Sequence, residues 1–548
     1  MTPEQLAAAI RAALQAAADA GDLAVDVPTE VRVERPRNRD HGDWSTNIAL
    51  RLAKEAGIPP RDVAAVLAER VRAIEGVQRV DVAGPGFLNI TLEAASAAGL
   101  ARAIVEAGAT YGHGTSEAGR VVNLEFISAN PTGPLHIGHT RWAALGDAMR
   151  RLLDAAGAHV TSEYYINDAG AQMDKFGASV LARAQGEEPP EGGYPGAYVE
   201  DLAQQVLSER PDLTSLEHDE AVALARDLGY HAQLEAIRGT LERFGVHFDV
   251  WFSERSLHDG GAVEEAVARL RQQGHVYDDG GAVWLRTTDF TDDKDRVLVR
   301  ADGVPTYFAA DAAYYLSKKD RGFDEKVYLL GADHHGYINR LKAIAACAGD
   351  DPEHNIEVKI GQLVAIAGER MGKRRGNAIY MDELIEWIGS DAVRYSLARY
   401  PADSPLSLDG EELRKQTNDN PVFYVQYAHA RTANVARLAA EDGVRREDGF
   451  DASLLSDPTE ATLLAALGDF PRVLAQAAHL MEPHRVARYL EELAGAFHKW
   501  YDTCRVRPLT AEEEITDLHR SRLWLNDATR QVLANGLDLL GVSAPERM

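Results

Sequence analysis

One stretch of the sequence, residues 120–153, constrains the fold more than any other. It reads RVVNLEFISANPTGPLHIGHTRWAALGDAMRRLL, and its first apolar run, Val121 to Ile127, is typical of a buried parallel strand. The next residues include two prolines and a glycine, which interrupt both helix and strand. A helical pattern then runs from Thr140 to Leu153. Strand, turn and helix form half of a mononucleotide-binding unit, so we expect phosphate at the free amides of the helix N-terminus.

Two histidines lie at this turn. His136 and His139 are three positions apart, so at the first helical turn they share one face and both can donate to phosphate oxygens. We expect Gly138 to leave space above that face for a base or ribose. Two alternatives are a zinc half-site and a pair of core histidines. The only cysteines, Cys347 and Cys504, are far apart in sequence, which disfavours zinc, and the position at a strand-to-helix turn disfavours the core.

Composition places the chain among globular proteins. Its 548 residues suffice for about three to four domains, and 45% are hydrophobic, with a mean hydropathy of -0.28. No apolar run is long enough for a membrane span, and the start of the chain lacks the pattern of a secretory segment. Two cysteines favour a reducing compartment, so we expect a cytoplasmic protein. A net charge of -27 argues against a general nucleic-acid binder but does not exclude an RNA that contacts a local basic track.

Residues 1 to about 110 read as a small α/β domain. Within it, Arg35, Arg37 and Arg39 precede Trp44, which we expect to be exposed. Arginines and an aromatic face suit a structured RNA loop, the charges for phosphate and the ring for a base. The alternative is a solvated loop whose arginines pair with neighbouring aspartates.

The middle of the chain is harder to interpret. We read residues 185 to about 290 as a connective insertion and predict no chemistry there. Afterwards, Tyr307 and Asp311 are four apart, so a phenol and a carboxylate can point into one pocket, although such a pair can also form a surface hydrogen bond. A predicted strand at Lys326–Leu330 ends in Gly331-Ala332-Asp333-His334-His335-Gly336. Polar residues at the carboxyl end of a parallel strand face the ligand crevice.

A basic loop and a helical region complete the chain. Residues 368–377, GERMGKRRGN, carry four cations between glycines and can close over a polyphosphate, although a solvated charge run is the alternative. From Asp382 onward the pattern is helical. There Tyr424, Tyr427 and Arg431 lie at helical spacing, where they can stack on RNA bases or belong to the core.

Several of these segments resemble a known family. ANPTGPLHIGH, residues 129–139, resembles the HIGH motif of class I aminoacyl-tRNA synthetases in its arginyl-tRNA synthetase form. RPRNRDHGDWSTNIAL and GPGFLNITL are similar to the N-terminal appended domain of arginyl-tRNA synthetases, which is associated with the elbow of tRNA, and the final helices, down to SAPERM, are similar to their anticodon-binding domain. The basic loop lies where the class carries KMSKS, with Met371 and Lys373 matching and Arg370 and Gly372 departing from that motif.

The resemblance implies a fold and an activity. The fold is a Rossmann-type parallel-sheet catalytic domain with an N-terminal α/β domain and a C-terminal all-α bundle. The implied domains are 1–110, tRNA-contacting; 111–380, catalytic, with the insertion at about 185–290; 381–420, a helical junction; and 421–548, anticodon-binding. The implied activity is ligation of L-arginine to tRNA(Arg) through arginyl-adenylate, using ATP and Mg²⁺, by a monomer. Another HIGH-motif class I synthetase and a non-catalytic tRNA-binding paralogue are the alternatives.

The resemblance also implies site residues. The predicted catalytic residues are His136, His139 and Lys373, and no resident metal site is expected. The predicted arginine-binding residues are Glu125, Ser128, Asn130, Tyr307, Asp311 and His334. The predicted ATP-binding residues are Pro131, Thr132, Gly133, Pro134, Leu135, His136, Ile137, Gly138, His139, Gly331, Asp333, His335, Met371 and Lys373. The predicted tRNA-binding residues are Arg37, Arg39, Trp44, Tyr424, Tyr427, Arg431 and Met548.

Overall fold

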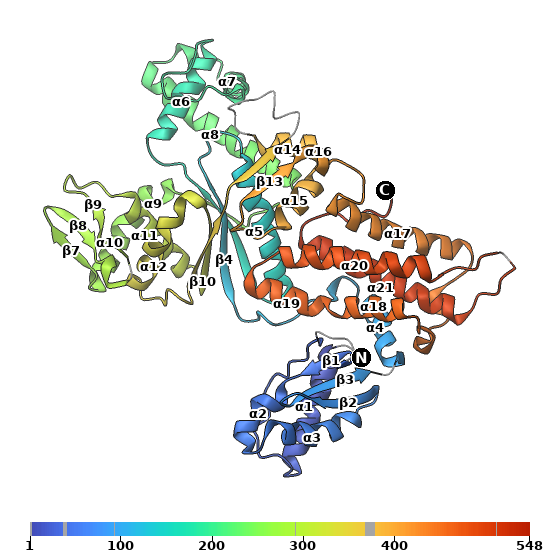
Figure 1. The fold of residues 1–548 in the computed structure, drawn as a ribbon. Helices are drawn as coiled ribbons and strands as arrows, with labels where there is room; N and C mark the ends of the chain where they lie inside the picture. Colours follow the sequence, from blue (N-terminus) through green and yellow to red (C-terminus); the bar gives the residue numbers. More distant parts are fainter. Residues whose placement is uncertain (1–2, 37–40, 93, 291, 368–378, 511) are drawn as a thin grey trace.

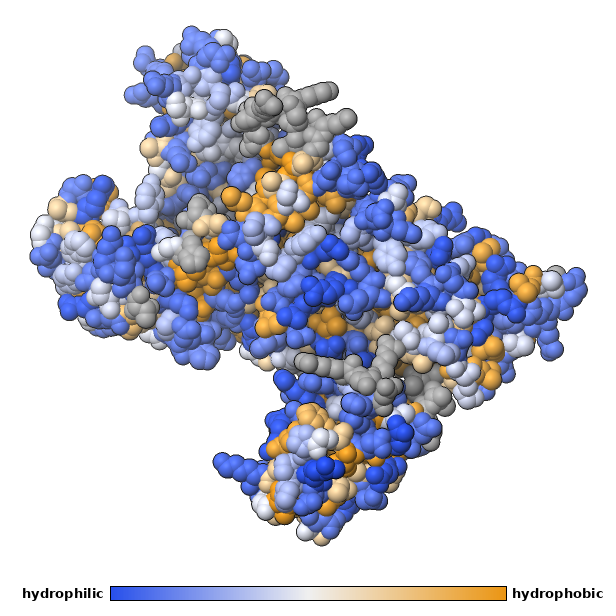
Figure 2. Space-filling model, viewed as in Figure 1, coloured by the Kyte–Doolittle hydropathy of each residue, from blue (hydrophilic) through white to orange (hydrophobic). Residues whose placement is uncertain are grey.

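The computed structural model describes residues 3–36, 41–92, 94–290, 292–367, 379–510 and 512–548 (Figure 1). A small N-terminal α/β unit and a C-terminal helical bundle flank a central parallel sheet covered by helices (Figure 1). This arrangement confirms the predicted fold class. Figure 2 shows that hydrophilic residues cover most of the visible face. Among the described residues, no helix combines the length and the apolar character that a membrane span needs.

The N-terminal unit packs its helices on a three-stranded antiparallel sheet of order β1-β3-β2. Apolar residues recur every four positions in the first helix, at Leu6, Ile10 and Leu14, and all three are fully buried. Strands β2 and β3 form a hairpin around Gly84, Pro85 and Gly86, as the turn residues predict. The elements of this unit are α1 (Pro3–Asp19), β1 (Trp44–Thr46), α2 (Ile48–Ala56), α3 (Pro60–Arg72), β2 (Val77–Ala83) and β3 (Phe87–Leu92).

The central sheet has five parallel strands in the order β11-β10-β4-β5-β6. Its middle strand, β4, is the apolar run predicted from the sequence, and every residue from Val122 to Ile127 is buried. The edge strand β6 comes from inside the region that we read as connective, so this interruption contributes to the sheet. The elements around the sheet are β4 (Val121–Ala129), α5 (Ile137–Ala155), β5 (His159–Ile166), β6 (Val250–Ser253), α11 (Tyr307–Asp320), β10 (Glu325–Gly331), α12 (Ile338–Cys347) and β11 (Ile356–Gly361).

Two smaller groups of elements are inserted between the sheet strands. A helical group follows β5 and forms the upper part of Figure 1; its members are α6 (Ala171–Ala184), α7 (Ala197–Glu209) and α8 (His218–Arg243). An antiparallel sheet with two helices follows β6; it comprises α9 (Arg255–Asp259), α10 (Ala262–Gln272), β7 (Val276–Asp279), β8 (Ala282–Leu285) and β9 (Arg296–Val299). Both groups border the carboxyl edge of the central sheet and can therefore form walls of a site there.

The C-terminal part is helical, as predicted, apart from a short parallel pair of strands before it. Its core also takes in α4, which lies within the predicted 1–110 unit but packs against α21 with Leu100, Ala101 and Ile104 buried. The remaining elements are α4 (Ala94–Ala107), β12 (Val364–Ala367), α14 (Met381–Ile388), α15 (Ser390–Ala398), β13 (Leu406–Asp409), α16 (Gly410–Leu413), α17 (Pro421–Glu441), α18 (Pro458–Gly468), α19 (Phe470–Leu480), α20 (His484–Thr503) and α21 (Asp517–Leu539).

A buried ion pair links this bundle to helix α5 of the central sheet. Arg394 of α15 donates to Asp147 of α5, and both side chains are almost wholly inaccessible. The same guanidinium donates to the backbone oxygens of Phe244 at 2.8 Å and Leu540 at 3.2 Å. One side chain therefore joins α5, the end of α8 and the end of α21. Gly541 has a φ of 65°, and a Cβ there would lie 1.9 Å from Arg394 Nη2, so glycine is needed where the chain passes the guanidinium.

We predict that Arg394→Met lowers the stability of the chain by about 1–3 kcal/mol, because the backbone oxygens of Phe244 and Leu540 lose their donor and the buried Asp147 carboxylate keeps only Arg150 and Arg151. The midpoint of chemical unfolding measures the loss. Asp147→Asn/Arg394→Met should cost less than the two single changes together, since the double variant does not leave the Arg394 guanidinium buried without its carboxylate. The matched control is Arg79→Met, which removes the exposed pair with Asp81 and should change little. Equal effects of Arg394→Met and Arg79→Met would contradict the role given to Arg394.

Candidate active site

The candidate site begins where β4 ends and α5 starts. His136 is the N-cap of α5, and its Nδ1 accepts from the Gly138 amide at 3.1 Å. His139 Nδ1 accepts from the His136 amide at 3.3 Å, which completes a reciprocal capping box. The two rings stack with their centroids 3.9 Å apart. The histidines predicted to share one face therefore do so, at the positive end of a 19-residue helix.

Both rings are neutral at physiological pH. Burial lowers the pKa of His136, and burial together with His136 lowers the pKa of His139 to about 3. Each Nδ1 accepts a hydrogen bond, so the single proton of each neutral ring is on Nε2. Each Nε2 is consequently a donor that the helix cap orients. Such donors at a helix N-terminus suit an anionic ligand.

The structure gives Gly138, between the two histidines, a different role from the one that we expected. A Cβ at Gly138 would lie 2.9 Å from His136 Cε1. The ring of His136 therefore occupies the space that we expected to remain open for a base or ribose. Glycine is required here because the capping ring folds back over the helix start.

Four acids converge at the carboxyl edge of the sheet, around the ring of Tyr165 on β5. Burial, and then the charges of Glu254, Asp311, Glu125 and Asp168, raise the pKa of this phenol. Glu125 comes from β4, Asp168 and Glu254 follow β5 and β6, and Asp311 comes from α11. Glu125 and Asp311, predicted to serve one pocket, therefore lie close enough to influence the same group.

Glu254 and Asp311 are the most strongly perturbed of these acids. Burial, with the charges of Asp311 and Asp168, raises the pKa of Glu254 to about 7. Burial raises the pKa of Asp311 to about 6; the hydroxyl of Tyr337, which donates to this carboxylate, opposes the rise, and Glu125 adds to it. Carboxyls held near neutrality by loss of water gain most from a cationic ligand.

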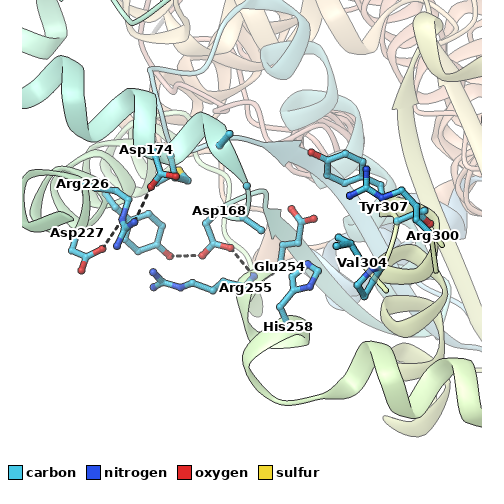
Figure 3. A pocket seen from close by; sticks show the side chains of 17 residues that line it. Asp168, Asp174, Arg226, Asp227, Glu254, Arg255, His258, Arg300, Val304 and Tyr307 are labelled. Carbon is cyan, nitrogen blue, oxygen red and sulfur yellow. Dashed lines mark hydrogen bonds and ion pairs between the residues drawn. The ribbon is translucent and has the colours of Figure 1, made fainter. Parts of the chain in front are cut away.

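A cavity of about 820 Å³ opens beside Glu254 (Figure 3). Glu254 points into this space between Asp168 on one side and Tyr307 on the other (Figure 3). The Glu254 side chain is 4% exposed and accepts no hydrogen bond from the described residues, whereas Asp168 accepts from Tyr230, Ser253 and the Arg255 amide. Asp311 is not among the residues that line the cavity, but its charge acts on Glu254 in the cavity wall. The volume is within the usual range for small-molecule sites.

Glu254 was missed by the sequence analysis, although a signal for it existed. It directly follows Val250–Ser253, and polar residues after a parallel strand face the ligand crevice. The same reasoning identified the polar residues after β10. It was not applied to Glu254, because a run of only four residues inside the region 185–290 gave no indication that it belongs to the central sheet.

Glu125, one of the predicted arginine-binding residues, is ion-paired within the protein. Its Oε2 accepts from Lys318 Nζ at 2.6 Å, and the Lys318 side chain is wholly inaccessible. The sequence analysis did not anticipate this partner. Asp311, the other predicted acid, accepts a hydrogen bond from the Tyr337 hydroxyl.

The other predicted small-molecule contacts have varied surroundings. Ser128 and His334 are exposed, and Asn130 donates to the Asn167 oxygen at 3.1 Å. Tyr307 is 78% exposed and lines the cavity. The turn residues Pro131, Thr132 and Leu135 are buried, Gly133, Pro134 and Ile137 are half-buried, and Gly331 ends β10. The side chains of Asp333 and His335, and the whole of Met371 and Lys373, lie outside the described residues.

The expectation of an exposed tryptophan in the N-terminal unit is wrong. Trp44 is 4% exposed, with the Arg35 guanidinium 4.3 Å from its ring centre. Arg35 Nε also donates to Asp469 at 3.1 Å, so this arginine links the N-terminal unit to the bundle. The ring of Trp44 is therefore closed to an RNA base in this conformation. Arg37 and Arg39 lie outside the described residues.

Aromatic and basic residues gather on one side of α17. Phe423 and Tyr427 stack at 5.8 Å, and Arg431 Nη2 donates to the Tyr427 hydroxyl at 2.7 Å. The Arg431 guanidinium also lies 4.8 Å from the ring of Tyr501, which is 39% exposed. This set, with Tyr424 and His498 packed beside it, is half-buried rather than core, and Met548 at the chain end is 55% exposed.

Comparison with known proteins identifies the family. Family models match along the chain: "Arginyl tRNA synthetase N terminal domain" over residues 4–92, "tRNA synthetases class I (R), catalytic domain" over 101–193 and 217–398, and "DALR anticodon binding domain" over 425–548. The arginine–tRNA ligases of Renibacterium salmoninarum and Paenarthrobacter aurescens are each 66% identical over 551 residues, covering 100% of both chains.

A solved structure agrees at the level of fold. The arginyl-tRNA synthetase of Thermus thermophilus aligns with a TM-score of 0.75 at 24% identity, covering 100% of each chain. The full-length relatives leave no support for another HIGH-motif synthetase or for a non-catalytic paralogue. The chain belongs to the arginyl-tRNA synthetase family of class I aminoacyl-tRNA synthetases, and its activity is that of an arginine–tRNA ligase.

Proposed function

We propose that Glu254 and Asp311 receive the guanidinium of arginine in the cavity beside Tyr307. The observation that carries this proposal is the unpartnered Glu254 carboxyl, buried and pointing into the cavity beside Asp311. A guanidinium is a planar cation whose donors match carboxylates, and it would replace the solvation that both acids have lost. Glu125, Ser128, Asn130, Tyr307 and His334 are proposed to contact other parts of the amino acid.

The chemistry needs positioning more than covalent participation. The carboxylate of arginine attacks the α-phosphorus of ATP, a new C–O–P bond forms, and pyrophosphate leaves with the electron pair of the broken P–O bond. A hydroxyl of the tRNA 3′ end then attacks the activated carbonyl carbon, and AMP leaves. The Nε2–H groups of His136 and His139 are placed to donate to phosphate oxygens as negative charge shifts. No nucleophilic serine or cysteine is required.

The nucleotide is proposed to lie along the turn before α5 and the end of β10. This places ATP on residues 131–139, Gly331, Asp333 and His335, with Met371 and Lys373 of the basic loop at the pyrophosphate. The free amides and the partial positive charge of the helix start support it. Since both histidines are neutral, further positive charge must come from the basic loop and from the metal that accompanies ATP.

Magnesium is proposed as part of the substrate Mg–ATP. Within the described part of the chain, no three His, Cys, Asp or Glu side chains form a group that could hold a metal ion. Mg²⁺ usually keeps several waters and binds through substrate phosphates with few protein ligands. When bound, it would neutralise phosphate charge.

For tRNA(Arg), we propose the surface of Tyr424, Tyr427, Arg431 and Met548 as the anticodon contact, and Arg37 and Arg39 as the tRNA elbow contact. Aromatic rings and an arginine at partial exposure suit splayed bases. Trp44 is proposed only as support for the N-terminal unit. We propose that the enzyme acts as a cytoplasmic monomer with the four domains given above.

We predict that Glu254→Gln and Asp311→Asn each raise the KM for arginine about 100-fold while changing the KM for ATP less than threefold. A neutral amide loses the charge-assisted bond that recognises the guanidinium. Steady-state aminoacylation measures both constants. The matched control is Asp174→Asn, another acid of the cavity wall, which is ion-paired with Arg226 and should leave arginine use intact. Equal losses for arginine and ATP would show that the acids are misassigned.

Arginine binding should also depend on pH. The carboxyls of Glu254 and Asp311, with pKa values of about 7 and 6, must be ionised to bind a guanidinium. Below pH 6 they hold protons that binding must release, so the dissociation constant should be at least tenfold higher at pH 6 than at pH 8. Calorimetry in two buffers measures the proton release. Glu254→Gln should remove most of the dependence above pH 6.5; the same slope in that variant would rule Glu254 out.

At the other end of the molecule, Arg431→Gln should raise the KM for tRNA about tenfold and leave arginine and ATP binding unchanged. The change removes the contacts that hold Tyr427 and Tyr501 together, and base–aromatic stacking contributes about 1–3 kcal/mol per base. The control is Arg437→Gln on the same helix, which pairs with Glu441 at the surface. If both variants bind tRNA alike, the surface is not the tRNA contact.

A further inference from the structure

Four residues on one face of α11 form a stripe that leads from the solvent to the base of the proposed arginine pocket. Tyr307, Asp311, Tyr314 and Lys318 are spaced by four, three and four positions, so they lie on one helix face. Their exposure falls steadily along the stripe: Tyr307 is 78% exposed, Asp311 is half-buried, Tyr314 is 5% exposed and Lys318 is 0% exposed. The stripe therefore ends in a charged residue with no access to water. A buried ammonium is costly unless it is paired.

The groups around Lys318 come from every neighbouring element. Its Nζ donates to Glu125 of β4 at 2.6 Å and lies 3.9 Å from the ring centre of Tyr328 on β10 and 4.4 Å from that of Tyr314. The remaining charged neighbour is Glu163 of β5, which Tyr314 and Arg321 already bind. Burial favours protonation of Glu163, but Lys318 and Arg321 outweigh it and hold its pKa below the usual value. Lys318 therefore acts on both acids, but Arg321 and Tyr314 bind Glu163 directly, whereas the direct bond of Lys318 goes to Glu125.

The acids of the pocket carry more negative charge than arginine can balance. Free arginine brings two cationic groups, the guanidinium and the α-ammonium. Glu125 and Glu254 each lie within electrostatic reach of Asp311, and all three acids act on Tyr165. Arg340, which lowers the pKa of Asp311, and the α-carboxylate of arginine add one charge of each sign. The three carboxylates of the pocket therefore still exceed the two cationic groups of arginine by one, and like charges this close oppose full ionisation. Asp168 does not alter the comparison, because three donors of its own satisfy it.

We propose that Lys318 is a positioning residue of the arginine pocket, a resident counter-ion that balances the charge of Glu125 and so allows Asp311 and Glu254 both to ionise and receive the guanidinium. This inference rests on the proposed function, because it takes those two acids to be the arginine ligands. Lys318 does not touch the substrate. It acts through Glu125, whose charge would otherwise oppose ionisation of Asp311.

A purely structural role for the pair predicts something different. If Lys318 and Glu125 only hold β4 against α11, removal of either partner should perturb the pocket in the same direction. A counter-ion role predicts opposite directions. Lys318→Met leaves an extra negative charge beside Asp311, which makes that acid harder to ionise. Glu125→Gln leaves an extra positive charge, which makes Asp311 easier to ionise.

The experiment measures arginine binding to the full chain by calorimetry between pH 5.5 and 8.5, and takes the midpoint of the pH dependence as the readout. We expect K318M to move the midpoint upward by about one pH unit and to weaken binding at pH 7 at least tenfold. E125Q should move the midpoint downward. E125Q/K318M, which replaces the pair by neutral side chains, should restore the wild-type midpoint. If K318M does not fold, E125Q and the double variant still test the proposal, since neither leaves a buried carboxylate unpaired.

Midpoints that move in the same direction in both single variants, or that do not move, would overturn the proposal. ATP affinity serves as the control and should change less than threefold in all three variants; a larger loss would indicate a general collapse of the sheet edge and would also overturn it. Failure of the proposed function looks different. In that case D311N and E254Q would leave the wild-type pH dependence unchanged, whatever the Lys318 variants do.

Discussion

Loss of water from carboxylates is the constraint on which this site depends. Glu125, Glu254 and Asp311 gather around Tyr165 at the edge of the sheet, where burial makes each negative charge costly. The protein relieves that cost only in part. Lys318 binds one oxygen of Glu125 and the Tyr337 hydroxyl binds one of Asp311, whereas Glu254 accepts no hydrogen bond from the described residues. In the proposed arginine pocket, the guanidinium of the substrate would relieve the remaining cost, so affinity and selectivity would have one cause.

The fold brings this acidic pocket next to a nucleotide site by means of a single strand. Strand β4 carries Glu125 in its middle. At its carboxyl end it leads into the turn before α5, the helix that His136 caps. The helix that follows is fixed at two points. At its start the histidines cap it, and further along the Asp147 carboxylate is held by Arg394, which also binds the ends of α8 and α21. The position of the free amides at the start of α5 therefore depends on packing between the central sheet and the helical bundle.

Features that a contiguous stretch of sequence specifies were predicted, whereas features that depend on contacts between distant residues were not. The strand, turn and helix around His136 and His139 were predictable because a contiguous pattern specifies them, and the observed α5 begins within three residues of the predicted start. Glu254 was not found, because β6 has only four residues and belongs to the sheet through pairing with β5. The Glu125–Lys318 pair joins positions 193 apart and leaves no local trace. Trp44 was predicted to be exposed because its neighbours in sequence are charged, whereas its burial comes from residues of the N-terminal core, most of them distant in sequence.

The acids at the sheet edge carry negative charge, whereas the two histidines at the start of α5 are neutral. This separation favours a cationic ligand beside the acids. A protonated histidine at the start of α5 would add a fixed cation at the sheet edge where the proposed arginine-binding acids also lie. Capping prevents this, because both Nδ1 atoms accept backbone amides and burial lowers both pKa values. The rings keep their donating Nε2–H groups and contribute no net charge. In the proposed ATP site, positive charge for the phosphates would therefore come from the metal of Mg–ATP and from Lys373.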